Sequence, residues 1–426
     1  MKQPKIKKLD NGLTIVTIPT DSPSVTVMSL VNTGSRFEDP SNNGISHFLE
    51  HMCFKGTLKK SGKEIMRYLD GLGAETNAFT SYEVTGYYVK SITKHWKKTL
   101  NVVSDIYLYS QFPVAEMEKE KGVIIGEISM YEDMPMRQVH DIFMTLVYGN
   151  QPAGWSILGP RKNILEMTQD DFLQYHNHHY IAANTTIVVS GQVNQPEVIA
   201  EVSKRFKNIN QGSQTKKQSA VNTQKKPGLK CEYKKTDQTH MIMGYTTVGF
   251  HHKDALALKI CGALLGGGMS SRLFETLRED MGVGYYVHAS NNTQSDTGIL
   301  QISCGVDSTR VREVIVAIKK EIQNLQDELV SIEELKKTKE FIIGNTNMGL
   351  ESTDDRAYYY GQRSMHGLLI QTPRSFAADI QSVTARDIRR VIRKYALSER
   401  LNLAMIGPHK DAENKLFMKA IKKTTN

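Results

Sequence analysis

The sequence lacks long hydrophobic runs and has few cysteines. No apolar stretch approaches the roughly 20 residues that a membrane-spanning helix needs, so we expect no membrane segment. The opening residues MKQPKIKKLDNG carry lysines but neither arginine nor an apolar core, which predicts neither a secretory signal nor a mitochondrial transit peptide. The four cysteines are widely spaced and form no CxxC pair, a usage typical of a reducing compartment. We therefore expect a cytoplasmic protein.

Basic residues outnumber acidic ones, 54 to 45, which gives a formal charge of +9. A basic protein raises the question of nucleic-acid binding. However, lysines concentrate in the polar stretch 211–227 and in the C-terminal tail, and no motif interleaves them with aromatic residues. We interpret both as solvated segments and expect no nucleic-acid partner.

A chain of 426 residues is too long to fold around one hydrophobic core, because single cores stop growing at about 250–300 residues. Residues 211–226, QGSQTKKQSAVNTQKK, are polar, contain no aromatic side chain and precede Pro-Gly, so they are typical of a linker. We predict a first domain at 1–210, a linker at 211–227 and a second domain at 228–426.

The two halves resemble each other. Gly-Tyr-Tyr-Val occurs at 86–89 and again at 284–287, and each half closes with a Thr-x-x-Asp sequence, at 168–171 and 384–387, that can cap a helix before a final strand. Two matches in the same order indicate duplication. Each half contains stretches in which apolar and polar residues alternate, as in half-buried strands, with helical stretches between them. We predict an α+β fold with two homologous domains, each a mainly antiparallel sheet with helices packed on it.

The segment GISHFLEHMCFKGT, residues 44–57, combines an apolar helical pattern with two histidines and a carboxylate. His47, Glu50 and His51 share one helical face. Two imidazoles one turn apart can hold a zinc ion, and the carboxylate can reach a water there. The alternative interpretation is a surface helix, or a core histidine with its hydrogen bonds satisfied.

A catalytic zinc needs a third protein ligand. In the helical stretch after Pro113, Glu116, Glu118 and Glu120 lie among lysines and look solvated, whereas Glu127 has apolar neighbours. A carboxylate in such surroundings should have a strong partner. From the residues alone, Glu127 is the favourite among several acids, and Glu120 could hold a ligand in place.

These residues resemble the pitrilysin/insulinase family of inverted (HxxEH) zinc metallopeptidases, most closely the branch of the mitochondrial processing peptidase and its bacterial relatives. The resemblance implies that His47, His51 and Glu127 bind one Zn²⁺ per chain and that Glu120 supports them. It implies an endopeptidase that cleaves peptides or unfolded segments inside a closed chamber, with Glu50 as general base on a zinc-bound water. Together with the cysteine usage and the opening residues described above, it makes a bacterial cytoplasmic protein our expectation.

Two further segments match this family. Residues 75–80, ETNAFT, resemble the edge strand along which a peptide adds, so Asn77, Ala78, Phe79 and Thr80 are expected to line the cleft. The segment GGGMSSRLFETLREDMGVGYYV lacks the spacing of a phosphate-binding loop. The resemblance places Arg278 and Tyr285 in it at a substrate-binding pair. The alternatives are a surface ion pair for Arg278 and a core position for Tyr285.

In this family, paired halves face each other like a clamshell around the chamber, and this chain has only enough length for one such half. The resemblance therefore implies a dimer, which we predict to be a homodimer. Two alternatives remain: a catalytically silent or partner-dependent subunit of a heterodimeric processing peptidase, and a basic nucleic-acid-binding protein with a structural metal. A rival metal cluster, His176, His178 and His179, has no carboxylate at helical spacing and is disfavoured.

Overall fold

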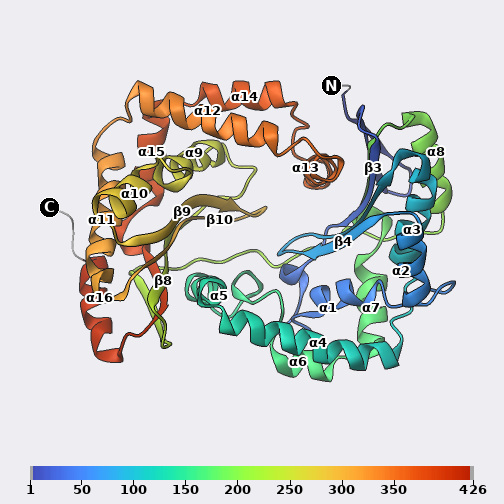
Figure 1. The fold of residues 1–426 in the computed structure, drawn as a ribbon, viewed down its shortest axis with the longest axis horizontal. Coiled ribbons are helices and arrows are strands. Elements are labelled where there is room, and N and C mark those ends of the chain that lie inside the picture. Colours follow the sequence, from blue (N-terminus) through green and yellow to red (C-terminus); the bar gives the residue numbers. More distant parts are fainter. Residues whose placement is uncertain (1–2, 423–426) are drawn as a thin grey trace. The chain divides into compact units, whose positions relative to one another are not determined.

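The computed structural model describes residues 3–422, and its contacts divide the chain into two compact units (Figure 1). Unit 1 consists of Met1–Ile128, Ser156–Gln218 and Asn347–Thr372. Unit 2 consists of Ser129–Trp155, Ser219–Thr346 and Pro373–Asn426. Among the described residues, no helix has both the length and the hydropathy needed to cross a membrane.

Unit 1 contains a six-stranded sheet in the order β1-β2-β6-β3-β5-β4. The β2–β6 pair is parallel and the other neighbours are antiparallel. The strands are β1 (Lys5–Lys8), β2 (Thr14–Pro19), β3 (Ser24–Val31), β4 (Glu75–Thr80), β5 (Thr85–Ile92) and β6 (Thr185–Gly191). Because β4 is the last strand in this order, one of its backbone edges has no strand partner within the sheet.

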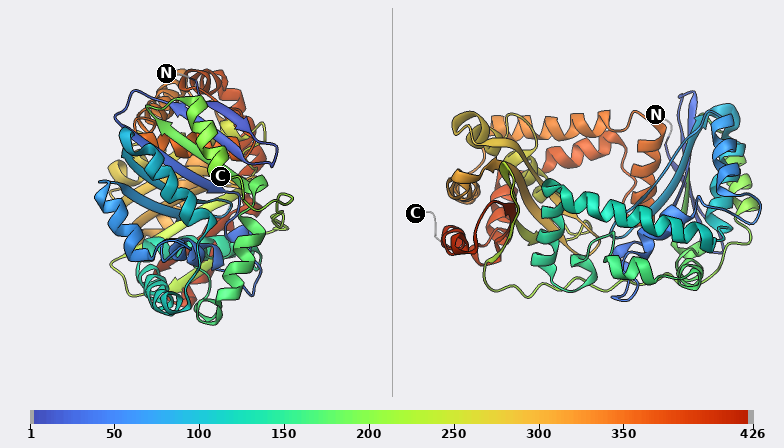
Figure 2. Two further views of the ribbon diagram at one scale, coloured as in Figure 1. Left: turned by 90° about the vertical axis from the view of Figure 1, so that its right-hand side faces the viewer. Right: turned by 60° about the horizontal axis from the view of Figure 1, so that its bottom comes forward.

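Helices cover both faces of the unit 1 sheet (Figure 2). Alternate residues of β3 enter two separate cores: Val25 and Val27 pack with α3 on one face, and Met28 and Leu30 pack with α13 on the other. The helices are α1 (Ile45–Met52), α2 (Gly62–Gly71), α3 (Trp96–Leu108), α4 (Val114–Asp133, of which 129–133 belong to unit 2), α6 (Arg161–Glu166), α7 (Gln169–His179), α8 (Gln195–Arg205) and α13 (Thr353–Met365).

Unit 2 contains a five-stranded sheet in the order β7-β11-β8-β10-β9. Its strands are β7 (Gly228–Tyr233), β8 (Gln238–Thr247), β9 (Gly284–Thr293), β10 (Gly298–Asp307) and β11 (Asn402–Gly407). Its helices are α5 (Pro135–Tyr148), α9 (Ala255–Gly266), α10 (Arg272–Phe274), α11 (Val311–Asp327), α12 (Ile332–Met348, whose last two residues belong to unit 1), α14 (Pro373–Ser382), α15 (Ala385–Tyr395) and α16 (Asn414–Lys422). A π-helical turn at Glu275–Asp280 follows α10.

The duplication predicted from the sequence is visible in the strand order. In unit 1 the sequence β2-β6-β3-β5-β4 has one parallel pair followed by antiparallel pairs, and β7-β11-β8-β10-β9 repeats that pattern in unit 2. The predicted caps are present, because Thr168 and Thr384 each form a capping box at equivalent helices, α7 and α15. The Gly-Tyr-Tyr-Val repeat is misleading, however, since it falls on β5 in unit 1 and on β9 in unit 2, whose equivalent is β4.

The two compact units differ from the predicted domains 1–210 and 228–426, because each half of the chain contributes one segment to the unit formed mainly by the other half. Residues 129–155, which include α5, lie with the second sheet, and residues 347–372, which include α13, lie with the first. The physical reason is that the central strands are apolar on both faces: every residue of β6 is buried. Residues 211–227, the predicted linker, form no helix or strand.

Candidate metal and catalytic site

The site is built on α1, whose first turn is held by a carboxylate from the preceding loop. Glu38 accepts hydrogen bonds from the backbone N–H groups of Gly44 (2.9 Å) and Ser46 (2.8 Å), the donors that a helix start leaves unpaired. Burial raises the pKa of Glu38, and these hydrogen bonds lower it. Gly44 has φ of 103°, and an added Cβ would meet the Leu158 carbonyl oxygen at 2.7 Å, so glycine is required there. The sequence reasoning missed Glu38.

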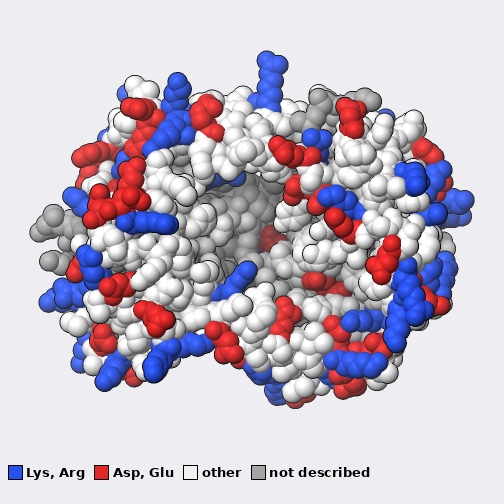
Figure 3. All heavy atoms as spheres, viewed as in Figure 1, with Lys and Arg blue, Asp and Glu red and all other residues white. Residues whose placement is uncertain are grey.

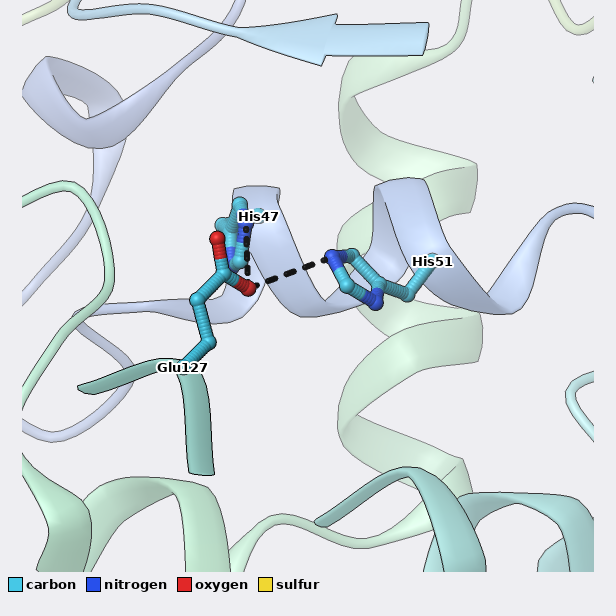
Figure 4. A group of neighbouring side chains, drawn as sticks. All are labelled: His47, His51 and Glu127. Carbon is cyan, nitrogen blue, oxygen red and sulfur yellow. Dashed lines mark ion pairs between the residues drawn. The ribbon is translucent and has the colours of Figure 1, made fainter. Parts of the chain in front are cut away.

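His47 and His51 on α1 and Glu127 on α4 point toward one another (Figure 4). Glu127 Oε2 lies 3.7 Å from His47 Nε2 and 3.8 Å from His51 Nε2. These distances are too long for hydrogen bonds. They are close to the separation of about 3.3 Å that tetrahedral zinc bonds of about 2.0 Å impose between ligand atoms.

The protonation state of His47 suits a metal ligand. Burial, and to a lesser extent the charge of His51, lowers the pKa of His47 to about 3. The imidazole is therefore neutral near pH 7, which is the form that binds metals. Two imidazole nitrogens and one carboxylate are a donor set that zinc prefers, and one tetrahedral position is left for a fourth ligand. The three residues thus fit a catalytic zinc.

Glu120 links this group to the residues that follow α1. Its Oε1 lies 2.9 Å from His51 Nδ1, and its Oε2 lies 2.5 Å from Lys55 Nζ. The Glu120 side chain is only 8% exposed, so its solvated appearance in the sequence is wrong. The reason is that α4 turns this face toward α1, where two cationic or donor groups replace water. Hydrogen bonding to Nδ1 fixes the ring and leaves Nε2 of His51 for a metal.

Glu50 is held by a side chain from the edge strand. Thr80 Oγ1 on β4 donates a hydrogen bond of 2.6 Å to Glu50 Oε2. Burial raises the pKa of Glu50, while the Thr80 hydrogen bond and the charge of His51 lower it. A carboxylate with a raised pKa beside a metal group is suited to accepting and returning a proton. Sequence reasoning placed Thr80 in the cleft but did not identify this contact.

The other three predicted cleft residues also lie on β4. Asn77 is exposed, and its Oδ1 accepts a hydrogen bond of 2.9 Å from the backbone N–H of Ala78. The Phe79 ring lies 5.2 Å from the ring of Tyr358, on helix α13. Since β5 pairs with one edge of β4 and no strand of the described residues pairs with the other, β4 offers backbone groups for an added strand.

Arg278 and Tyr285 both lie in unit 2 and are both exposed. Tyr285 is the second residue of β9 and is 66% exposed, so the alternative of a core tyrosine is wrong. The Arg278 guanidinium lies 5.0 Å from the centre of the Phe274 ring, a cation–π contact. Their role toward a substrate stays a prediction.

The rival histidine cluster near the end of α7 has other partners. His176 Nε2 lies 2.9 Å from the carbonyl oxygen of Tyr107, and His179 Nδ1 lies 3.3 Å from Thr215 Oγ1. Burial lowers the pKa of His176 to about 4 and that of His179 to about 3. Within residues 3–422, only His47, His51 and Glu127 bring three ligand atoms together in a metal-binding arrangement.

Two family models match the chain. The model described as "Insulinase (Peptidase family M16)" matches residues 14–161, and that described as "Peptidase M16 inactive domain" matches residues 166–342. The three candidate metal ligands, His47, His51 and Glu127, lie within the first match. In the part of the second match that the structure describes, no such group occurs.

Curated relatives match nearly the whole chain, and a solved structure shares its fold. The chain is 34% identical over 407 residues to "Uncharacterized zinc protease YmxG" of Bacillus subtilis (strain 168), covering 93% of this chain and 97% of the relative. An "Uncharacterized zinc protease" of Rickettsia bellii (strain RML369-C) is 31% identical, covering 95% of this chain and 97% of the relative. The fold is similar to that of a protease from Helicobacter pylori, with a TM-score of 0.88 at 22% identity, over 95% of this chain and 99% of that one.

Proposed function

The chain belongs to the insulinase family of peptidases (family M16), and from this premise we propose that it is a zinc-dependent endopeptidase cleaving peptides or unfolded segments. One observation carries the proposal: the ligand atoms of His47, His51 and Glu127 meet at zinc-ligand spacing beside Glu50. A zinc ion held there supplies Lewis-acid chemistry, which lowers the pKa of a water and polarises a carbonyl.

Glu50 moves the protons in this proposal. Its carboxylate, oriented at Oε2 by Thr80, accepts a proton from the water that attacks the scissile carbonyl. It then delivers that proton to the nitrogen of the leaving amine, so that one carboxylate serves both halves of the hydrolysis. Because burial raises the pKa of Glu50, its carboxylate is a stronger base than an exposed glutamate.

The free edge of β4 supports a peptide substrate. A peptide that adds as a strand is held mainly through backbone hydrogen bonds, which tolerate many sequences but require an extended chain. That requirement favours short peptides and unfolded segments over folded proteins. In this proposal Asn77 to Thr80 line the cleft beside Glu50, and Arg278 and Tyr285 contact the substrate from unit 2.

The test is cleavage of a quenched, unstructured peptide of about 10–20 residues by zinc-loaded protein and by its Glu50→Gln variant. We expect cleavage by the first, loss of cleavage in the second, and equal zinc content in both by elemental analysis. Glu166→Gln, which alters an exposed glutamate on α6, is the matched control and should cleave normally.

Two results would contradict the proposal. If Glu50→Gln lost its zinc, Glu50 would be a ligand rather than the base. If the zinc-loaded protein cleaved none of the peptides, the chain would instead be a silent or partner-dependent subunit, and the same assay repeated with a second chain would identify which.

A further inference from the structure

An open pocket of about 920 Å³ adjoins the metal helix in unit 1. Its floor is formed where α2 begins directly against the residues that follow α1. A Cβ added to Gly62 would lie 2.9 Å from the carbonyl oxygen of Phe54 and 3.1 Å from Cα of Lys55. This close approach joins the pocket to the metal site, because Lys55 binds Glu120 and Glu120 contacts His51.

The pocket has an excess of positive charge. Lys55, Lys60, Lys63 and Arg67 line it, against one acid, Glu116. Lys55 is neutralised by Glu120, and Glu116 is held by Lys119 at 2.6 Å. Three cationic side chains are therefore left over. In Figure 3, blue spheres gather over the region of α2, at the right-hand side of the view.

The carboxylates nearest these three cations have other hydrogen-bond partners: the charges of Lys60 and Arg67 act on Glu64, and the charge of Lys63 acts on Glu116, which binds Lys119. Within residues 3–422, no ion pair forms at Lys60, Lys63 or Arg67. The nearby Glu64 is engaged in the cap of α2, where it accepts hydrogen bonds from the backbone N–H of Ser61 (2.8 Å) and from its hydroxyl (2.7 Å). Because Lys63 and Arg67 are four residues apart on one helix, they share a face and repel each other unless an anion lies between them.

Apolar groups lie among the charges. Phe54, Met66 and Pro113 line the same pocket, and Met66 is 37% exposed. An inorganic anion has no apolar part that could pack against these side chains. A carboxylate at the end of an aliphatic stem matches both features, since the stem covers the apolar side chains and the carboxylate reaches the cations.

We propose that this pocket binds a carboxylate group of the peptide substrate, so that the enzyme favours substrates with an acidic group close to the scissile bond. The inference rests on the proposed function and extends it to substrate choice. The carboxylate comes from a Glu or Asp side chain or from the C-terminus of the peptide, and the experiment separates these sources.

The test measures binding without cleavage. Zinc-loaded Glu50→Gln protein is titrated against fluorescent peptides by anisotropy, with Gln replaced by Glu at each position in turn and the C-terminus either amidated or free. We expect at least one Glu peptide, or the free C-terminus, to bind about fivefold more tightly than its neutral counterpart, the effect of one or two partly exposed ion pairs. A preference confined to the free C-terminus assigns the pocket to the chain end.

Three pairs of substitutions in the Glu50→Gln protein assign this preference to the pocket. Lys63→Ala with Arg67→Ala should abolish it, and Lys63→Glu with Arg67→Glu should reverse it in favour of a Lys peptide. Lys59→Ala with Lys98→Ala changes the net charge of unit 1 by the same amount outside the pocket lining and should leave the preference intact.

The proposal is overturned if acidic and neutral peptides bind equally, if neither binds, or if the control pair removes the preference as well. Its failure is distinguishable from failure of the proposed function. Acid-selective binding without cleavage by the zinc-loaded parent would keep the pocket and reject the endopeptidase. Cleavage without acid selectivity would do the reverse.

Discussion

Glu50 depends on one neighbour for its orientation. The Thr80 hydroxyl donates to Oε2 at 2.6 Å, from a strand that lies 30 residues further along the chain. A hydrogen bond to a charged group contributes about 1.5–3 kcal/mol, so its loss should slow a step in which Glu50 moves a proton. The same threonine belongs to the edge strand, so its backbone contributes to substrate binding whatever its side chain.

We therefore predict that Thr80→Val lowers kcat by about 10- to 100-fold and changes KM little, because the hydrogen bond is lost and the strand is kept. Thr80→Ser keeps the hydroxyl and should retain most of kcat. Steady-state kinetics on a quenched peptide separates the two constants, with Thr76→Val on the same strand as control. An equal loss in the Ser and Val variants, or a loss confined to KM, would show that Thr80 acts only structurally.

The role of a single residue could be predicted when the residues it acts with lie close to it in the sequence. His47, Glu50 and His51 could be placed on one face because helical spacing is local. Glu127 was one acid among several until the family resemblance selected it. The burial of Glu120 could not be predicted, because it depends on how α4 packs against α1 rather than on the lysines beside it in sequence.

At the scale of elements, the strands and capped helices were predictable and their partners were not. Alternation identified β3, β5, β9 and β10, and Thr-x-x-Asp identified the starts of α7 and α15. The helix that covers the second face of each sheet comes from the other half of the chain. The period of apolar residues in a helix does not indicate which sheet the helix covers. The only sequence sign of the exchanged helices is therefore a strand such as β6, all of whose residues are buried.

The exchange of α13 can be tested at one glycine. Gly361 lies against the unit 1 sheet, where an added Cβ would be 2.6 Å from Leu30 Cδ1 and 2.7 Å from Val188 Cγ2. Gly122, on α4 of the same unit, has no such neighbour within 4 Å. In a helix interior, alanine is favoured over glycine by about 1 kcal/mol, whereas overpacking a core costs about 1–3 kcal/mol.

We therefore predict opposite signs for the same substitution. Gly122→Ala should raise the free energy of unfolding of unit 1 by up to about 1 kcal/mol, and Gly361→Ala should lower it by about 1 kcal/mol or more. Urea unfolding followed by the fluorescence of Trp96, which is buried in unit 1, reports both variants in a Trp155→Phe background, which removes the tryptophan of unit 2. Stabilisation by Gly361→Ala would mean that α13 does not pack on this sheet.

At the scale of the whole molecule, duplication has separated two roles. Five strands keep the same order in both units, yet within residues 3–422 only unit 1 brings together three side chains that could hold a metal ion. The family predicted from the zinc helix and Glu127 is confirmed by the family models and by the relatives that cover nearly the whole chain. The expected homodimer rests on the family resemblance rather than on residue patterns, because subunit number depends on surfaces whose partner is another chain.

The family resemblance makes a homodimer our expectation, because it implies a chamber closed by two pairs of such domains and this chain has one pair. The free edge of β4, at which a substrate would add, also benefits from cover against water and against other strands. Light scattering at micromolar concentration should therefore give twice the chain mass of 48.0 kDa.

A second measurement distinguishes an active dimer from an incidental one. Diluting the protein below its dimer dissociation constant should reduce specific activity in parallel with the fraction of dimer, since an isolated chain would leave the chamber open. A mass of 48.0 kDa at full activity would reject the dimer. A mass of 48.0 kDa without activity, restored by a different chain, would establish the partner-dependent subunit in its place.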